Sequence, residues 1–96
     1  MTRYKVIIAS RVDNQLLEHF RFIANVSIPA AKRFRDEFGN TVKEISENPY
    51  QFPIDADLNL PEGMYRKAFF SRWYKIHFTI KDETVFIDAV ADCRQG

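Results

Sequence analysis

The hydrophobic residues of this chain change their spacing once, and that change constrains the fold more than any other feature. Between residues 16 and 45 they recur every three or four positions, as on one face of an α-helix. Between residues 74 and 80 they alternate strictly with polar residues, as along a β-strand with one buried face. A chain of 96 residues with this pattern predicts one α+β domain, residues 1–96.

Two helices are predicted in the first half. An amphipathic helix of about 13 residues follows the cap residues found between positions 10 and 14. Ser27 and Pro29 start a second helix, because serine caps a helix and proline costs nothing in the first turn. This helix should extend to about Glu47, with Gly39 and Asn40 loosening or kinking it. The short link between the helices predicts an antiparallel hairpin.

Strands are predicted at residues 4–9, 64–70, 74–80 and 84–91. The last of these is nearly continuous in apolar residues, which indicates a central strand. The expected order is β-α-α-β-β-β: an N-terminal strand, the helical hairpin and a three-stranded antiparallel meander. The helices should cover one face of the sheet, over Ile76, Phe78 and Ile80. The opposite face would then present Lys75, His77 and Thr79 to solvent or to a ligand.

Charge is distributed unevenly along the chain. The formal net charge is only +1, which argues against holding nucleic acid by bulk positive charge. Residues 48–63 nevertheless contain three acidic and no basic residues, and residues 64–81 contain five Lys or Arg and no acidic residue. We expect residues 48–63, which include three prolines, to form an irregular loop that packs its own Tyr50, Phe52 and Leu58 or serves a partner. A further hypothesis is that its acidic residues cover the basic strands and compete there with phosphates.

Several classes of protein are excluded by the residues. The single cysteine, Cys93, allows no internal disulfide and fits a reducing cytoplasm. No apolar run reaches the roughly 18 residues of a membrane span. Two histidines and one cysteine without ligand spacing predict no metal, and the absence of a glycine-rich phosphate loop predicts no cofactor. We expect Cys93 to be buried, His19 to be solvated, and the helical phenylalanines, Phe22 included, to lie in the core. Phe22 falls off the main apolar stripe, however, and an exposed aromatic there would favour a protein-binding groove between the hairpin and the sheet.

A series of short motifs runs through the whole chain in a characteristic order. Asn48-Pro49 ends the second helix, Tyr65-Arg66-Lys67 opens a strand, Tyr74-Lys75-Ile76-His77-Phe78 forms the next, and Asp92-Cys93-Arg94-Gln95 follows the last. The ordered set resembles the RelE/ParE superfamily of bacterial toxins from type II toxin–antitoxin modules. This resemblance implies a compact toxin held inactive by a small antitoxin protein. It also implies that operator DNA is bound by the antitoxin, and by the toxin only through it.

The superfamily has two main activities, and both are kept as hypotheses. ParE-like members poison DNA gyrase, whereas RelE-like members cut mRNA on the ribosome. A metal-independent ribonuclease must move protons and stabilise charge on phosphorus. RelE-like nucleases usually supply a tyrosine or a His–Tyr pair at the C-terminus, and nothing after Arg94 in this chain provides one. That departure and the low net charge favour the ParE-like reading, in which the toxin binds a protein target such as gyrase.

Six residues are singled out by the resemblance and the charge pattern. If the chain is a ribonuclease, Arg66 and Arg94 would stabilise the transition state and His77 would carry the proton. Lys67, Arg72 and Lys75 form a basic patch for binding the target or RNA. Each residue also has a structural interpretation: an ion pair for Arg66 and Arg94, a plain exposed or hydrogen-bonded histidine for His77, and a solvated face for the patch. A third hypothesis is a small non-toxic interaction domain that shares only the architecture.

Overall fold

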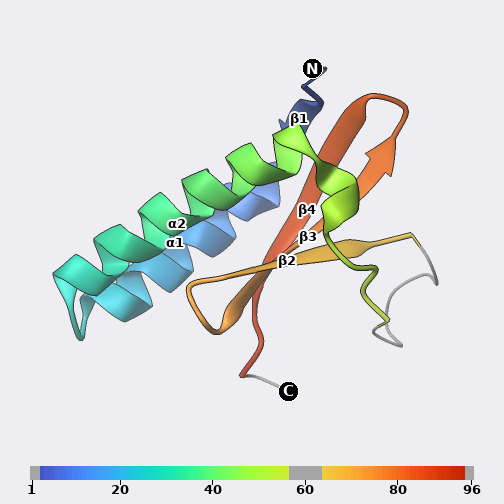
Figure 1. Ribbon diagram of the computed structural model, residues 1–96. Helices are drawn as coiled ribbons and strands as arrows, with labels where there is room; N and C mark the ends of the chain where they lie inside the picture. Colours follow the sequence, from blue (N-terminus) through green and yellow to red (C-terminus); the bar gives the residue numbers. More distant parts are fainter. Residues whose placement is uncertain (1–2, 57–63, 95–96) are drawn as a thin grey trace.

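The computed structural model describes residues 3–56 and 64–94. The elements follow in the order β1 (Lys5–Ile8), α1 (Ser10–Ala24), α2 (Ile28–Glu47), the short 3-10 helix η1 (Pro49–Gln51), β2 (Arg66–Phe70), β3 (Tyr74–Lys81) and β4 (Thr84–Asp92). Figure 1 shows the two helices side by side across one side of the sheet. The predicted α+β class and the order of strands and helices are confirmed.

The strands form one mixed sheet in the order β1-β4-β3-β2. β2, β3 and β4 make the predicted antiparallel meander, and β1 pairs with β4 in the parallel direction. β4 is therefore a central strand, as its continuous apolar sequence indicates. β1 takes the outer position beside β4, and the helical hairpin connects it to β2 at the opposite edge of the sheet.

The second helix starts as predicted but is not interrupted. The Ala30 N–H donates a hydrogen bond of 3.2 Å to the Ser27 hydroxyl, which caps the first turn. Gly39 lies inside a helix that runs unbroken from Ile28 to Glu47, so the predicted kink is wrong. A glycine costs a helix only about 1 kcal/mol. The packing of Phe38 and Val42 against the core on either side outweighs that cost.

The first helix begins earlier than its apolar pattern indicates. β1 passes almost directly into α1, because the Ala9 N–H donates to the Ile87 carbonyl and the Val12 N–H donates back to the Ala9 carbonyl, each at 2.9 Å. Ser10 is thus already the first helical residue, without a side-chain cap before it. This early start places Val12 in the core, fully buried.

The hydrophobic core lies between the hairpin and one face of the sheet. Ile76 and Phe78 are fully buried there, as predicted. The Phe34 ring of α2 lies 4.7 Å from the Tyr74 ring, measured between centroids. Phe22, by contrast, is 62% exposed, so its predicted place in the core is wrong. Its neighbour Ile23 packs against the core instead, because one helical position turns a side chain by about 100°.

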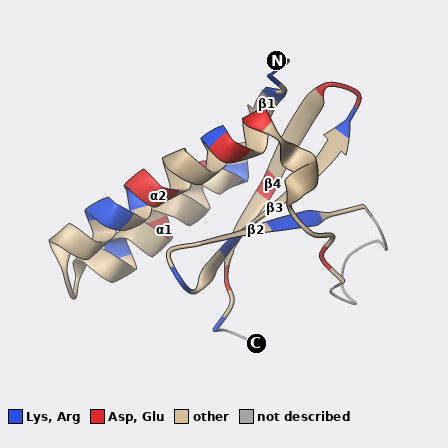
Figure 2. Cartoon of the chain, viewed as in Figure 1, with Lys and Arg blue, Asp and Glu red and all other residues tan. Residues whose placement is uncertain are grey.

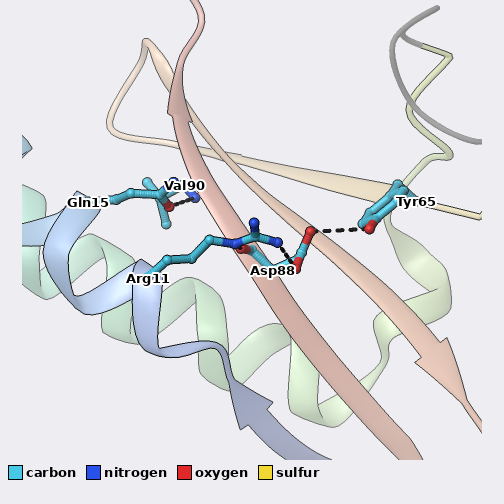
Figure 3. A network of polar contacts seen from close by, with 5 residues as sticks. All are labelled: Arg11, Gln15, Tyr65, Asp88 and Val90. Atoms are coloured by element: carbon cyan, nitrogen blue, oxygen red, sulfur yellow. Dashed lines mark hydrogen bonds and ion pairs between the residues drawn. The ribbon is translucent and has the colours of Figure 1, made fainter.

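Beyond the end of β1, side chains of α1 bond to the open edge of β4. The Arg11 Nε donates to the Asp88 carbonyl at 2.8 Å, and one turn later the Gln15 Oε1 accepts from the Val90 N–H at 2.9 Å. Figure 3 shows these contacts and the Arg11–Asp88 ion pair. Asp88 sits where the β3–β4 register shifts, so its backbone is unpaired in the ladder. Side chains of α1 therefore make the hydrogen bonds that a neighbouring strand would otherwise make to the last part of β4.

His19 continues the same face of α1, four residues after Gln15. Its Nε2 lies 3.4 Å from the Val90 carbonyl oxygen, and its ring lies 4.9 Å from the Tyr74 ring. The prediction that His19 is solvated is therefore wrong. The spacing of four residues on a helix brings it over the sheet edge together with Gln15.

The segment before β2 is more ordered than its composition indicates. Pro49–Gln51 forms η1, so the prediction of a wholly irregular loop is wrong at these residues. Phe52 packs its ring 5.9 Å from that of Phe78, and Ile54 forms an antiparallel bridge with Arg66. The predicted packing of Leu58 lies outside the described residues. Within the described part of the chain, no helix is both long and apolar enough to cross a membrane.

Candidate functional site

The six residues proposed from the sequence fall into three places. Arg72 and Arg94 lie together beside the β2–β3 turn. Lys67, Lys75 and His77 lie together on the sheet face opposite the helices, which we call the outer face. Arg66 stands apart from both groups, near η1. The fold therefore divides the predicted site.

A hollow of about 560 Å³ opens where the connected ends of the two helices meet the β2–β3 turn. We call it the turn pocket. Its walls come from the end of α1, the first half of α2, the turn itself and Arg94, two residues after β4. The lining residues used below are Phe22, Val26, Arg33, Arg72, Trp73 and Arg94.

The turn pocket is both apolar and positively charged. Among its lining residues are three arginines and one acidic residue, Glu37. Trp73, 44% exposed, lies between two of the arginines. The guanidinium carbons of Arg72 and Arg94 are 5.9 Å and 5.4 Å from the centre of one of its rings, within the range of a cation–π interaction. Such an arrangement suits a partner with an acidic and an apolar group.

The position of Arg94 is set by Asp92. The Arg94 Nη2 and Nε donate to the two carboxylate oxygens of Asp92 at 2.8 Å and 3.1 Å. These hydrogen bonds hold the pKa of Asp92 below its ordinary value and raise the pKa of Arg94. The ion pair expected as the structural interpretation of Arg94 is therefore present, and it aims the guanidinium at Trp73.

The β2–β3 turn is strained at the mouth of the pocket. Ser71 and Arg72 have φ angles of 48° and 70°, in the left-handed region that side chains other than glycine rarely adopt. Each costs roughly 1–2 kcal/mol relative to an ordinary backbone conformation. The turn is held by the Trp73 carbonyl, which accepts from the Cys93 N–H at 2.6 Å. The strained backbone directs Arg72 and Trp73 toward the pocket.

Tyr74 contributes a neutral phenol to the pocket. Burial, followed by the negative charge of Asp92, raises the pKa of its hydroxyl, and Arg94 opposes this shift only in part. The hydroxyl therefore keeps its proton at neutral pH. Because the ring is only 2% exposed and packs against Phe34, Tyr74 stays in place as part of the pocket wall.

On the outer face, Asp55 gathers the remaining basic residues. Its carboxylate lies 2.9 Å from the Lys75 ammonium, 2.7 Å from the His77 Nε2 and 3.9 Å from the Lys67 ammonium. We call these four residues the Asp55 cluster. Lys75 and His77 lie on the predicted face, but their side chains are only 16% and 12% exposed because Asp55 covers them, so the expectation that they are open to solvent is wrong.

The loop before β2 places Asp55 over the sheet. The Asp55 N–H donates to the Tyr65 carbonyl at 2.8 Å, and the Lys67 N–H donates to the Pro53 carbonyl at 3.0 Å. These bonds extend the sheet by a short segment beside β2. In Figure 2 the basic residues at the beginning of β2 are blue and an acidic position in the segment before it is red. Opposite charges therefore lie close together at this place. The contrast between an acidic loop and basic strands in the sequence had indicated that loop carboxylates could cover this face, but not that Asp55 contacts His77.

Arg66 is engaged by residues of the preceding loop. Its Nη1 donates to the Phe52 carbonyl at 2.7 Å, and its guanidinium carbon lies 5.1 Å from the centre of the Tyr50 ring. The register pairs Arg66 with Phe78, whereas Asp92, two residues before Arg94, pairs with Tyr74. Four strand residues span roughly 13 Å. Arg66 and Arg94 thus lie at different ends of the sheet.

Cys93 is exposed, so the expectation of a buried cysteine is wrong. It follows the last strand, where alternation turns its side chain away from the helices. Partial burial of the thiol is the main cause that raises its pKa, so it stays protonated at neutral pH. A protonated thiol is a weak nucleophile. Within residues 3–56 and 64–94, no group of three or more His, Cys, Asp or Glu could hold a metal ion.

Comparison with known proteins identifies a family. Residues 6–95 match the family model described as the ParE toxin of the type II toxin–antitoxin system, parDE. A solved structure described as a chromosomal ParDE TA system from P. aeruginosa superimposes with a TM-score of 0.73 at 13% sequence identity. That likeness covers 96% of this chain and 98% of the other, and it concerns the fold. No curated protein sequence matches this chain significantly.

Proposed function

This chain belongs to the ParE family of toxins from type II toxin–antitoxin systems, and from that premise we propose that it arrests growth by binding a protein target. DNA gyrase is the first candidate, because the resemblance described above associates ParE-like toxins with this enzyme. The family also pairs the toxin with an antitoxin. We further propose that the antitoxin, rather than this chain, makes the contacts to operator DNA.

The turn pocket is the surface that best supports a protein contact. Phe22 and Val26 are 62% and 86% exposed at its rim, and Trp73 is 44% exposed between two arginines. Exposed aromatic residues beside arginines are the groups that contribute most to protein–protein binding energy. Solvating these apolar side chains in the free toxin is unfavourable, so a partner that covers them gains hydrophobic free energy.

The arrangement of the basic residues favours this activity over cleavage of RNA. A ribonuclease needs its charge-stabilising groups and its proton carriers around one phosphate. Here Arg66 is paired with Phe78 and Arg94 follows the residue paired with Tyr74, and these two β3 positions are roughly 13 Å apart along the strand. His77 is on the outer face, against Asp55, rather than beside either arginine. We assign Arg72 and Arg94 to target contact and the Asp55 cluster to a separate role.

The proposal is tested by inducible expression of the full chain in a bacterium, with and without the small gene beside it. We expect growth arrest that the antitoxin relieves, intact mRNA, and inhibition of DNA supercoiling by purified gyrase when the purified toxin is added. New mRNA 5′ ends at ribosomal A-site codons would overturn the proposal in favour of a ribonuclease. Arrest with normal supercoiling and intact mRNA would exclude gyrase and keep a different protein target.

A further inference from the structure

Asp55 is an unusual acidic residue because it is almost completely buried beneath basic side chains. It is 3% exposed, and its contacts with the Lys75 ammonium and the His77 imidazole are short. A carboxylate leaves water only when several charged hydrogen-bond donors compensate its lost hydration. The outer face supplies two ammonium groups from two strands, Lys67 of β2 and Lys75 of β3, and the His77 imidazole of β3 lies beside them.

These donors converge on one point, which is the requirement for binding an anionic oxygen. Lys75 and Lys67 approach the carboxylate from neighbouring strands, at 2.9 Å and 3.9 Å. A phosphate group places its oxygens among charged N–H donors in the same way. The Asp55 carboxylate thus occupies the position that an external phosphate would take if the loop were absent.

Aromatic side chains surround the same position. Phe69 is 56% exposed on β2, and the Lys67 ammonium lies 5.5 Å from its ring centre. The Tyr65 ring lies 6.4 Å from the ring of His77. Alternating basic and aromatic side chains on a sheet are what single-stranded nucleic acids bind, because bases stack on the rings while the cations contact phosphates.

We propose that the outer face is a binding site for the phosphates of a single-stranded nucleic acid, and that Asp55 masks it as a built-in anion. The mask neutralises the cations that a strand would otherwise contact. Removing this single charge converts the outer face into a nucleic-acid-binding surface. This inference does not depend on the target proposed above, because the turn pocket and the Asp55 cluster share no residue.

The test measures binding of a labelled single-stranded RNA oligonucleotide of about 12 nucleotides to the purified full chain. We expect Asp55→Asn to bind at least about tenfold more tightly than the unchanged protein at low salt, with a steeper loss of affinity as salt rises. Asp36→Asn is the matched control, because it removes one carboxylate from the exposed surface of α2. It should leave the affinity nearly unchanged.

Two further variants connect the gain to the outer face. Adding Lys67→Gln to Asp55→Asn should abolish most of the gained affinity. Asp55→Asn alone leaves Lys75 without its buried partner and could therefore fail to fold. The double variant Asp55→Asn/Lys75→Met removes both buried charges together and keeps Lys67 and His77, so it tests the inference in that case. We expect it to bind RNA more weakly than Asp55→Asn but still in a salt-dependent manner.

Three results would overturn the inference. The first is a folded Asp55→Asn, or a folded double variant, that binds RNA no better than the unchanged protein. The second is an equal gain of RNA affinity in Asp36→Asn, which would mean that the gain comes only from the change in net charge. The third is tight binding by the unchanged protein that Lys67→Gln weakens, since the face would then be open rather than masked.

Discussion

The backbone N–H of Val90, near the end of the sheet's longest strand, donates its hydrogen bond to the side chain of Gln15 on α1 at 2.9 Å. β1 ends at Ile8, opposite Ile87, so no strand continues along this side of β4. A helical side chain takes the place of a strand carbonyl. Position 15 therefore contributes to the sheet although it lies on a helix.

Replacing Gln15 with alanine should destabilise the protein. The substitution leaves the buried Val90 amide without its acceptor, at a cost of about 1–3 kcal/mol in the free energy of unfolding. Denaturant unfolding measures the loss, and hydrogen exchange of the Val90 amide should become faster. Gln51→Ala is the control, because the Gln51 amide is exposed and its change should stay within about 0.5 kcal/mol. Unchanged exchange at Val90 would contradict the assignment.

Two helical phenylalanines should differ sharply in their contribution to stability. Phe34 is 1% exposed, so Phe34→Ala should lower the free energy of unfolding by about 3–5 kcal/mol. Phe22 is exposed at the turn pocket, so Phe22→Ala should change it by less than about 0.5 kcal/mol. Thermal or denaturant unfolding of both variants checks this, and a large loss in Phe22→Ala would place that ring in the core.

Phe22 should also contribute to toxicity. Phe22→Ala and Trp73→Ala should each weaken binding to the target by at least about tenfold, because both remove apolar surface from the turn pocket. Phe69→Ala removes an equally exposed ring from the outer face and is the matched control. Growth after induced expression, with binding to purified gyrase, measures the effect. Toxicity lost in Phe69→Ala and kept in the other two would place the contact surface on the outer face.

The strained turn should allow stability and toxicity to be separated. Ser71→Gly should raise the free energy of unfolding by up to about 1 kcal/mol, because glycine adopts a positive φ without steric cost. Arg72→Gly should stabilise the fold similarly while reducing toxicity, since it removes a guanidinium from the turn pocket. Unfolding and growth assays on both variants test the idea. Loss of stability in Ser71→Gly would show that the turn is not strained.

The Asp92–Arg94 pair predicts a dependence of stability on pH. The pKa of Asp92 is lowered in the folded protein, so the pair stabilises the fold above the ordinary carboxyl value of 3.8 and loses that effect as pH falls through the folded value. Asp92→Asn should therefore lower the melting temperature at pH 7, and the difference from the unchanged protein should shrink below about pH 4. A constant difference down to pH 2 would contradict the assignment.

The elements of this fold follow from the amino-acid pattern because helix and strand periods depend on near neighbours. Ser27 with Pro29 starts α2, and the alternation through Ile76 and Phe78 makes β3 with one buried face. The resemblance carried by the ordered motifs also identified the toxin family. One error was at Gly39, where packing on either side outweighs the local cost of a glycine in a helix, and another was at Phe22, which the helical period itself turns away from the core.

The neighbours of the charged residues were decided only by the tertiary structure. Asp55 meets Lys75 across 20 positions of sequence, and Arg11 meets Asp88 across 77. No periodic pattern encodes such pairs, because they depend on where a loop returns and which strands become adjacent. The sequence therefore determined which helices and strands form and which family the chain resembles. The fold alone decided that Arg72 and Arg94 share a pocket while Lys67, Lys75 and His77 surround a buried carboxylate.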